Sequence, residues 1–184
     1  QTPIMIAIDV EWCIGMRIND GISYPYQMTL GAVTNDSLIA EMGRQIAEQC
    51  TRIGINVNFA PTVDVNNEPN NPVIGFRSFG ENADNVARKG LAYAMALQDN
   101  GVLPSMKHFP GHGNTMTDSH YGLPVVKNSL KEINKVELVP FKYLIDNGVK
   151  GAMVGHLYFP ALEPVPNQSS SLSKIMVTDL LRKE

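Results

Sequence analysis

Residues 103–120, LPSMKHFPGHGNTMTDSH, join a short apolar run to a polar loop that holds three of the chain's four histidines. The run 103–108 has the length and composition of a buried strand. Pro110, Gly111 and Gly113 exclude a regular helix or central strand immediately afterwards. The histidines are therefore predicted to lie on a loop at the end of a strand, where binding and catalytic groups concentrate.

The same order of elements recurs on both sides of this stretch. Strands are predicted at 3–9, 55–61, 103–108 and 151–156. Helices are predicted at 37–53, 83–99 and 130–147, with a fourth beginning near a cap at Ser171 or Ser173. In the first helix, Leu38, Met42, Ile46 and Cys50 lie four residues apart, with Asp36 or Ser37 as the cap. Alternating strands and helices predict one α/β domain with a parallel sheet, either doubly wound or closed into a barrel.

Polar side chains follow the predicted strands at the point where each strand ends. They are Asp9, Asp64, Lys107, His108 and His156. In βα architectures the carboxyl ends of the strands carry the active site. Four separate strands therefore indicate one site at this end of the sheet.

The composition narrows the class of protein. The 184 residues are 43% hydrophobic and 18% charged with a net charge of −3, which is typical of a soluble globular chain. No basic stripe is present for nucleic acid, and no apolar run approaches the roughly 20 residues of a membrane span. The first residues lack the basic segment and cleavage site of a signal peptide. Two cysteines exclude a disulfide-dense scaffold and a Cys-rich zinc site.

The histidine cluster has three interpretations: a metal site, a general acid/base site, or an ordinary hydrogen-bonded loop. The metal interpretation would use His108, His112, Asp118 and His120. It is disfavoured because this spacing matches no familiar zinc motif and Lys107 would repel a cation.

The acid/base interpretation rests on Asp118 and His120, which are separated by one residue. In an extended loop such residues point the same way, so the carboxylate can hydrogen-bond the imidazole. That contact would orient the ring, fix its tautomer and favour its protonated form. A histidine held in this way is a suitable proton donor to a leaving group.

The loop also resembles a known family. Its pattern K-H-F-P-G-H-G, a short gap, then D-S-H is the signature of the β-N-acetylhexosaminidases of glycoside hydrolase family 3. The segments 54–82 and 136–164 resemble that family's neighbouring blocks, and 6–17 is similar to its first sugar-contacting segment. The resemblance implies a (β/α)8 barrel in which residues 1–184 form a single partial N-terminal domain with roughly strands two to five.

The resemblance also implies roles for individual residues. His120 is implied to be the general acid/base, and Asp118 its partner. The residues implied to bind the sugar are Asp9, Arg17, Arg77, Lys107 and His108. His112 and Asp64 are interpreted as structuring the loop, and His156 either lines the pocket or is a hydrogen-bonded core histidine. No cofactor or metal is implied.

The activity expected from the resemblance is a retaining β-N-acetylglucosaminidase acting on cell-wall or chitin-type sugars. Alternatives are a phosphorylase of the same sugar, a β-glucosidase, a non-catalytic sugar-binding relative, or a metal-dependent hydrolase. The histidine acid/base points to N-acetylglucosaminides, because the β-glucosidase branch uses a glutamate from a further domain. The resemblance also allows such a further C-terminal domain in the parent protein.

Two departures from the family pattern qualify this expectation. Glu11, Trp12, Cys13 and Ile14 stand where the family usually has a glutamate followed by two glycines, and Trp12 either stacks on a sugar or fills the rim. A retaining glycosidase also needs a nucleophilic carboxylate, which the resemblance places on a sixth strand, beyond Glu184. The chain is therefore expected to be a fragment, and these 184 residues alone are expected not to turn over glycosides.

Overall fold

The computed structural model describes residues 4–118 and 120–183, and its elements alternate between strands and helices as predicted. The strands are β1 (Ala7–Ile8), β2 (Val57–Asn58), β3 (Leu103–Pro104), β4 (Met106–Phe109) and β5 (Ala152–Val154). The α-helices are α1 (Gln27–Gly31), α2 (Asp36–Arg52), α3 (Ala83–Asp99), α4 (Leu130–Lys135) and α5 (Leu138–Asp146). Shorter 3₁₀ helices span Ile14–Met16, Gly75–Arg77 and Ser170–Leu172, and a π-helix spans Ile175–Leu180.

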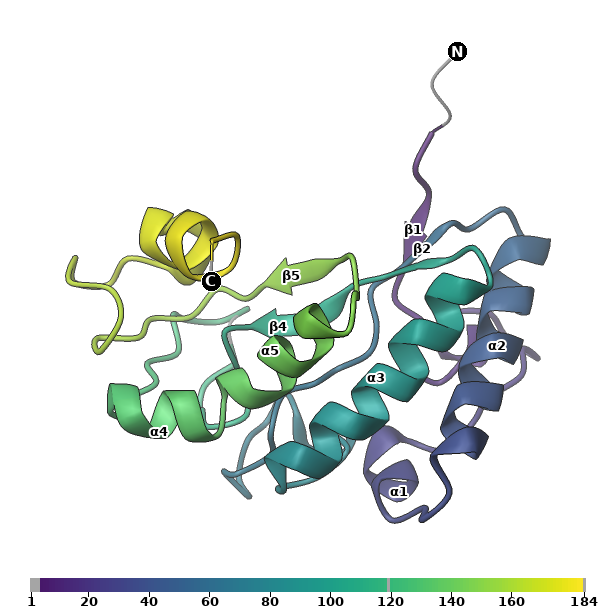
Figure 1. Cartoon of the computed structure of the whole chain (residues 1–184), viewed down its shortest axis with the longest axis horizontal. Helices are drawn as coiled ribbons and strands as arrows, with labels where there is room; N and C mark the ends of the chain where they lie inside the picture. The colour runs from purple at the N-terminus through teal and green to yellow at the C-terminus, as the bar shows by residue number, and fades with distance from the viewer. Residues whose placement is uncertain (1–3, 119, 184) are drawn as a thin grey trace.

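The strands are all parallel and lie side by side in chain order (Figure 1). β2 pairs with β1 on one side and β3 on the other, while β4 pairs with β5. β3 and β4 belong to one predicted strand, which changes partner at Ser105, and a bridge between Thr62 and Lys107 links the two sheets. With β3 and β4 counted as one strand, the described residues therefore contain four parallel strands that form one continuous wall.

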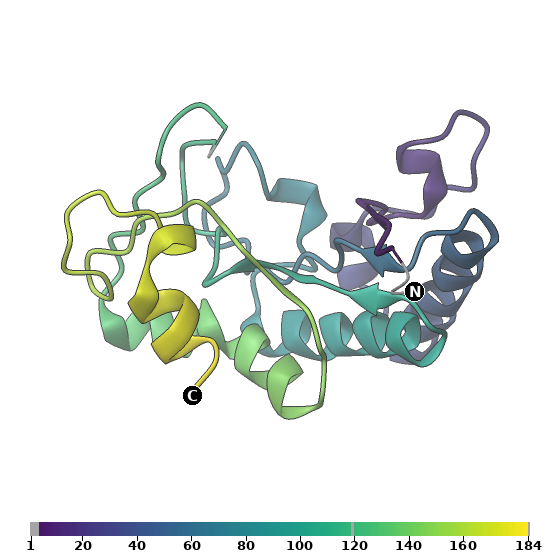
Figure 2. The same ribbon diagram turned by 90° about the horizontal axis from the view of Figure 1, so that it is seen from above.

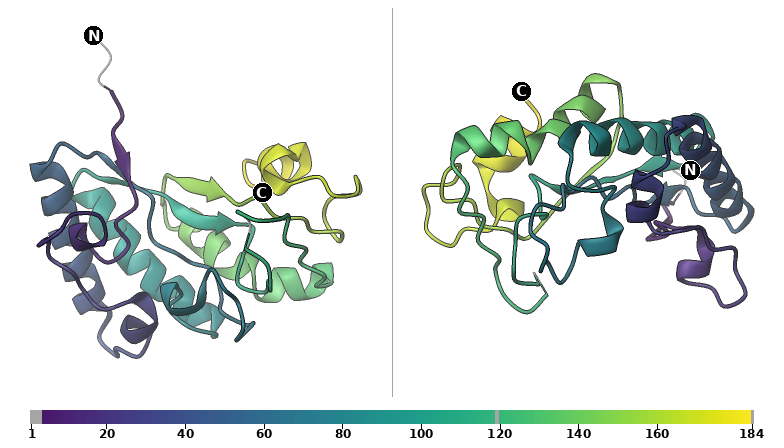
Figure 3. Two further views of the ribbon diagram at one scale, coloured as in Figure 1. Left: turned by 180° about the vertical axis from the view of Figure 1, so that it is seen from behind. Right: turned by 90° about the horizontal axis from the view of Figure 1, so that it is seen from below.

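The helices decide between the two predicted architectures. α2, α3 and α5 pack against one another in chain order, and Figures 2 and 3 show them in one layer along the strands. A doubly wound sheet would reverse its strand order and carry helices on both faces. Sequential parallel strands with their helices on one face form the wall of a (β/α) barrel. None of the described helices is both long and apolar enough to cross a membrane.

The core between strands and helices is apolar. Its fully buried side chains include Val10, Ile39, Ile46, Cys50, Val63, Val86, Leu97, Phe141 and Leu144. On α2 the predicted apolar stripe is wrong at its first residue, because Leu38 is 58% exposed and Ile39 is buried in its place. Ile39 fits the 3.6-residue period with Met42, Ile46 and Cys50, whereas a strict four-residue spacing drifts around the helix.

Several helix ends differ from the prediction. α2 is capped by Asn35, whose side chain accepts a hydrogen bond from the Ser37 N–H, so the predicted cap at Asp36 or Ser37 is one residue or more too late. The predicted helix 130–147 is two helices, α4 and α5. Pro140 explains the break, because proline is accepted in the first turn of α5 but not inside one long helix. After Ser173, which accepts from the Met176 N–H, the last predicted helix is a π-helix.

Candidate active site

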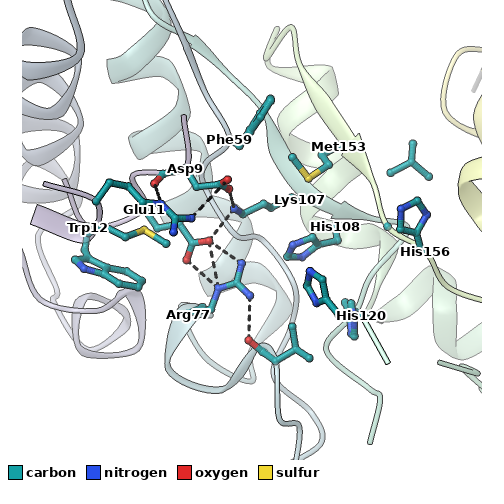
Figure 4. A pocket seen from close by; sticks show the side chains of 16 residues that line it. Asp9, Glu11, Trp12, Phe59, Arg77, Lys107, His108, His120, Met153 and His156 are labelled. Atoms are coloured by element: carbon teal, nitrogen blue, oxygen red, sulfur yellow. Dashed lines mark hydrogen bonds and ion pairs between the residues drawn. The ribbon is translucent and has the colours of Figure 1, made fainter. Parts of the chain in front are cut away.

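A pocket of 630 Å³ lies where the strands end (Figure 4). Six of the seven residues that the sequence singled out line it: Asp9, Arg17, Arg77, Lys107, His108 and His120. The seventh, Asp118, contacts His120. The wall is completed by His156 and by apolar side chains, among them Trp12, Phe59 and Met153. Side chains from β4 and β5, and from the segments that follow β1, β2, β4 and β5, thus converge, as expected for the carboxyl ends of parallel strands.

Asp118 and His120 make the contact that their spacing predicts. Nδ1 of His120 lies 2.7 Å from Oδ1 of Asp118, and the same oxygen accepts the backbone N–H of His120 at 2.9 Å. These two donors hold the pKa of the Asp118 carboxyl below its ordinary value. Because a carboxylate only accepts, the ring carries its hydrogen on Nδ1 and leaves Nε2 for the pocket. The His120 side chain is 81% exposed, so Nε2 is accessible.

Asp64 forms a second carboxylate–imidazole pair, but a buried one. Its Oδ2 lies 2.7 Å from Nδ1 of His108, and its oxygens accept the backbone N–H groups of His108 and His112. Burial raises the pKa of Asp64, yet the charge and hydrogen bonds of His108 and His112 outweigh burial and hold that pKa low. Asp64 therefore fixes the first turn of the histidine loop, the structuring role expected for it.

The loop that follows is held tightly against the segment after β2, at Val65 and Asn71. Asn71 donates its amide hydrogens to the carbonyl oxygens of His112 and Gly113. A Cβ at Gly113 would lie 1.7 Å from the Val65 carbonyl oxygen, so only glycine fits there. The ring of His112 is buried against Thr115, at 2.7 Å from its hydroxyl, and burial lowers the pKa of this imidazole. His112 therefore belongs to the buried hydrogen-bond network that shapes the loop.

Glu11, which is not among the predicted site residues, lies at the centre of the charged groups. Its buried carboxylate contacts Lys107 Nζ at 2.7 Å and accepts three hydrogen bonds from Arg77 at 2.7–3.2 Å. Lys107 also contacts Asp9 at 2.8 Å. Arg17 joins from outside, with Nε donating to the Asp9 carbonyl at 3.0 Å. The available signal was a second carboxylate two residues after Asp9.

Trp12 and His156, whose roles the sequence left open, both lie at the edge of the pocket. Trp12 packs edge-on against Tyr26, with ring centroids 4.6 Å apart, so it both fills the rim and faces the pocket. His156 lines the opposite wall, and its Nδ1 lies 2.6 Å from the Ser171 hydroxyl.

The three histidines of residues 103–120 have different hydrogen-bond partners. Each ring nitrogen Nδ1 has its own partner: Asp64 for His108, Thr115 for His112 and Asp118 for His120. Among residues 4–118 and 120–183, no group of three His, Cys, Asp or Glu side chains is arranged to hold a metal ion.

Comparison with known proteins identifies the family. All 184 residues match the model of the glycosyl hydrolase family 3 N-terminal domain. The chain therefore belongs to glycoside hydrolase family 3, whose barrel architecture agrees with the strand order and the single helical layer.

Individual relatives show which members of the family the chain is similar to. The chain is 42% identical over 199 residues to Beta-hexosaminidase A of Pseudoalteromonas piscicida, covering 100% of this chain and 33% of that protein. It is 37% identical to Beta-hexosaminidase LpqI of Mycobacterium tuberculosis, covering 98% of this chain and 46% of that protein. The solved family 3 β-N-acetylglucosaminidase from Paenibacillus sp. str. FPU-7 superposes with a TM-score of 0.93 at 41% identity, covering 98% of this chain and 34% of that one. The chain spans a third to about half of the length of these relatives.

Proposed function

We propose that the protein carrying this chain is a glycoside hydrolase that releases terminal β-linked N-acetylglucosamine with retention of configuration. The observation that carries the proposal is the exposed His120 imidazole, whose Nδ1 is held 2.7 Å from Asp118 at the edge of the pocket. The names of the relatives, Beta-hexosaminidase and β-N-acetylglucosaminidase, supply the substrate class.

In the first half of the proposed reaction, His120 acts as the general acid. Protonated on both nitrogens, it gives the Nε2 proton to the glycosidic oxygen as the bond to the leaving group breaks. The Asp118 carboxylate stabilises the imidazolium and keeps Nδ1 protonated throughout. In the second half, neutral His120 accepts a proton from water, which attacks the sugar–enzyme ester. We assign the nucleophile to no residue of this chain, since the resemblance places it on a further strand.

The sugar hydroxyls would be bound by the charged groups on the other side of the pocket. The Asp9 carboxylate, with a side chain 36% exposed, can accept from two hydroxyl groups. Arg17 and Arg77, 48% and 25% exposed, can donate to sugar oxygens. His108 presents its ring edge beside them, while Lys107, 1% exposed, stands behind Asp9 with one N–H left for the substrate.

The test uses the full-length protein that carries these residues. It compares hydrolysis of nitrophenyl β-N-acetylglucosaminide with that of the β-glucoside, for wild type and His120→Ala. We expect a strong preference for the N-acetyl sugar and a loss of turnover in the variant. Because an acid catalyst matters most for poor leaving groups, the loss should be larger for chitobiose than for the nitrophenyl sugar.

Three results would overturn the proposal. Equal use of the glucoside would point to the β-glucosidase branch, and product formation that requires phosphate would point to a phosphorylase. Unchanged hydrolysis of both substrates by His120→Ala would mean that the exposed imidazole is structural and that the acid lies elsewhere.

Chemical rescue of the variant by azide, with formation of the glycosyl azide, would support the acid/base role.

A further inference from the structure

We propose that Glu11 is a positioning residue that holds the sugar-binding cations Lys107 and Arg77 in place. The inference rests on the proposed function, because it takes Lys107 and Arg77 as sugar-binding groups. Glu11 itself lies behind them, with no exposed side-chain surface, and therefore acts through its neighbours.

The geometry places one carboxylate between two cations from different parts of the fold (Figure 4). Oε1 of Glu11 lies 2.7 Å from Lys107 Nζ on β4 and 2.7 Å from Arg77 Nη2 in the 3₁₀ helix Gly75–Arg77. Oε2 accepts Nε–H of Arg77 at 3.0 Å. Paired donors of this kind fix the plane of a guanidinium as well as its distance.

The backbone of Glu11 is itself held rigidly. The Tyr93 hydroxyl lies 3.2 and 3.0 Å from the carbonyl oxygens of Val10 and Glu11, and its single hydrogen is shared between these two acceptors. The Asn58 amide exchanges hydrogen bonds with the backbone of Val10. The carboxylate is thus anchored to α3 and β2, so it can impose its position on the cations instead of following them.

The electrostatics show what would happen without this charge. Burial raises the pKa of Glu11, but the hydrogen bonds and charges of Arg77 and Lys107 outweigh it and hold that pKa low. Lys107 has a side chain only 1% exposed, and Arg77 one 25% exposed, so water replaces little of a lost counter-charge. Without the Glu11 charge, Arg77 would lose its carboxylate partner and Lys107 would keep only Asp9, so the two neighbouring cations would repel each other more strongly and shift.

A second carboxylate–lysine–arginine cluster, built on an aspartate, provides a control. On the helical layer, Asp36 contacts Lys89 Nζ at 2.9 Å and also pairs with Arg88. Lys89 is as buried as Lys107, with 1% of its side chain exposed. This cluster links α2 to α3 and lines no part of the site pocket. Loss of Asp36 therefore tests what a broken carboxylate–lysine–arginine cluster does by stability alone.

The experiment compares Glu11→Gln, Glu11→Asp and Asp36→Asn in the full-length protein. It measures kcat and KM on nitrophenyl β-N-acetylglucosaminide, inhibition by N-acetylglucosamine, and the midpoint of thermal unfolding. We expect Glu11→Gln to raise KM and the inhibition constant about tenfold to a hundredfold with a smaller change in kcat. Glu11→Asp should recover part of the affinity, since it keeps the charge. Asp36→Asn should lower the unfolding midpoint and leave KM unchanged.

The possible failures are distinguishable. If wild type hydrolyses the sugar and Glu11→Gln keeps its KM and inhibition constant, the inference is wrong and the proposed function stands. If Glu11→Gln does not fold, Glu11→Asp decides, because its shorter side chain moves the carboxylate away from the cations. A folded Glu11→Asp with wild-type KM would show that the position of this carboxylate does not matter, and would overturn the positioning role. If wild type shows no hydrolysis, calorimetric binding of N-acetylglucosamine replaces KM. A wild type that neither hydrolyses nor binds the sugar refutes both proposals.

Discussion

Two carboxylate–imidazole pairs at this end of the sheet have the same contact distance and opposite surroundings. Nδ1 of His108 is 2.7 Å from Asp64, and Nδ1 of His120 is 2.7 Å from Asp118. In the first pair the carboxylate is fully buried and the imidazole 16% exposed. In the second pair the corresponding values are 28% and 81%.

The difference shows that burial, and not the pair itself, sets what a carboxylate–imidazole contact does. Burying a carboxylate is costly unless its oxygens are hydrogen-bonded, and Asp64 accepts from backbone N–H groups that shape the loop. An exposed imidazole can exchange its proton with water and with a substrate. We therefore expect the Asp64 pair to govern stability and the Asp118 pair to govern turnover.

The largest effect should come from exchanging the two imidazoles for alanine one at a time. His120→Ala should lower kcat by about 10²- to 10⁴-fold, because it removes the proposed general acid/base. His108→Ala should raise KM and lower the unfolding midpoint, because it leaves Asp64 buried without its ring partner. Steady-state kinetics and thermal unfolding of both variants measure this contrast. A kcat loss in His108→Ala equal to that in His120→Ala would remove the distinction.

The second-largest effect should be on the free energy of unfolding, when each of the two carboxylates is replaced by an amide. Asp64→Asn should lower the free energy of unfolding by about 2–3 kcal/mol, since the buried N–H groups of the loop lose a charged acceptor. Asp118→Asn should change it little, because the pair is largely solvated and exposed ion pairs contribute little. Urea titrations with unchanged slopes would give both values. A larger loss for Asp118→Asn than for Asp64→Asn would contradict the comparison.

A smaller effect should appear when the pH is lowered. The folded protein holds the pKa of Asp64 below its ordinary value, so its stabilisation is complete above the unfolded pKa of about 4 and is lost as the pH falls through the folded pKa. The stability difference between wild type and Asp64→Asn should therefore shrink in acid. Unfolding midpoints measured from pH 6 downward test this, and a difference that stays constant throughout would oppose it.

The sequence predicted those parts of the molecule that depend on nearby residues. The Asp118–His120 contact spans two positions, so its spacing alone indicated it. The four strands and the polar side chains at their ends followed from the alternation of apolar runs and loops. The helix that broke in two, 130–147, contains Pro140, which was a readable signal for the break.

The remaining contacts depend on residues far apart in the chain. His108 and Asp64 are 44 positions apart, and Arg77 and Glu11 are 66 apart. The pattern placed these residues at the same end of the sheet but gave no means of choosing partners among them. Glu11 was noted only as part of an unusual segment, because nothing local shows that its side chain is buried between two cations.

Glu137 is a third carboxylate for this comparison, because it is buried without a cationic partner among the described residues. Glu137 is 1% exposed, its Oε1 accepts from the Asn128 amide at 2.9 Å, and its Oε2 has no hydrogen-bond partner among the described residues. Burial raises the pKa of this carboxyl above its ordinary value, the reverse of Asp64. Its charge should therefore destabilise the fold progressively as the pH rises from the unfolded pKa through the folded one.

Glu137→Gln should consequently stabilise the protein by roughly 1 kcal/mol at neutral pH, because glutamine keeps an oxygen for Asn128 and removes the buried charge. The gain should vanish in acid, where glutamate is protonated. Glu132→Gln is the matched control: Glu132 is exposed, its Oε2 accepts from Ser129, and these hydrogen bonds lower its pKa. Unfolding measured at neutral and acid pH should show a gain at neutral pH only for Glu137→Gln. A loss of stability at neutral pH would instead mean that the charge on Glu137 is needed to hold Asn128 in place.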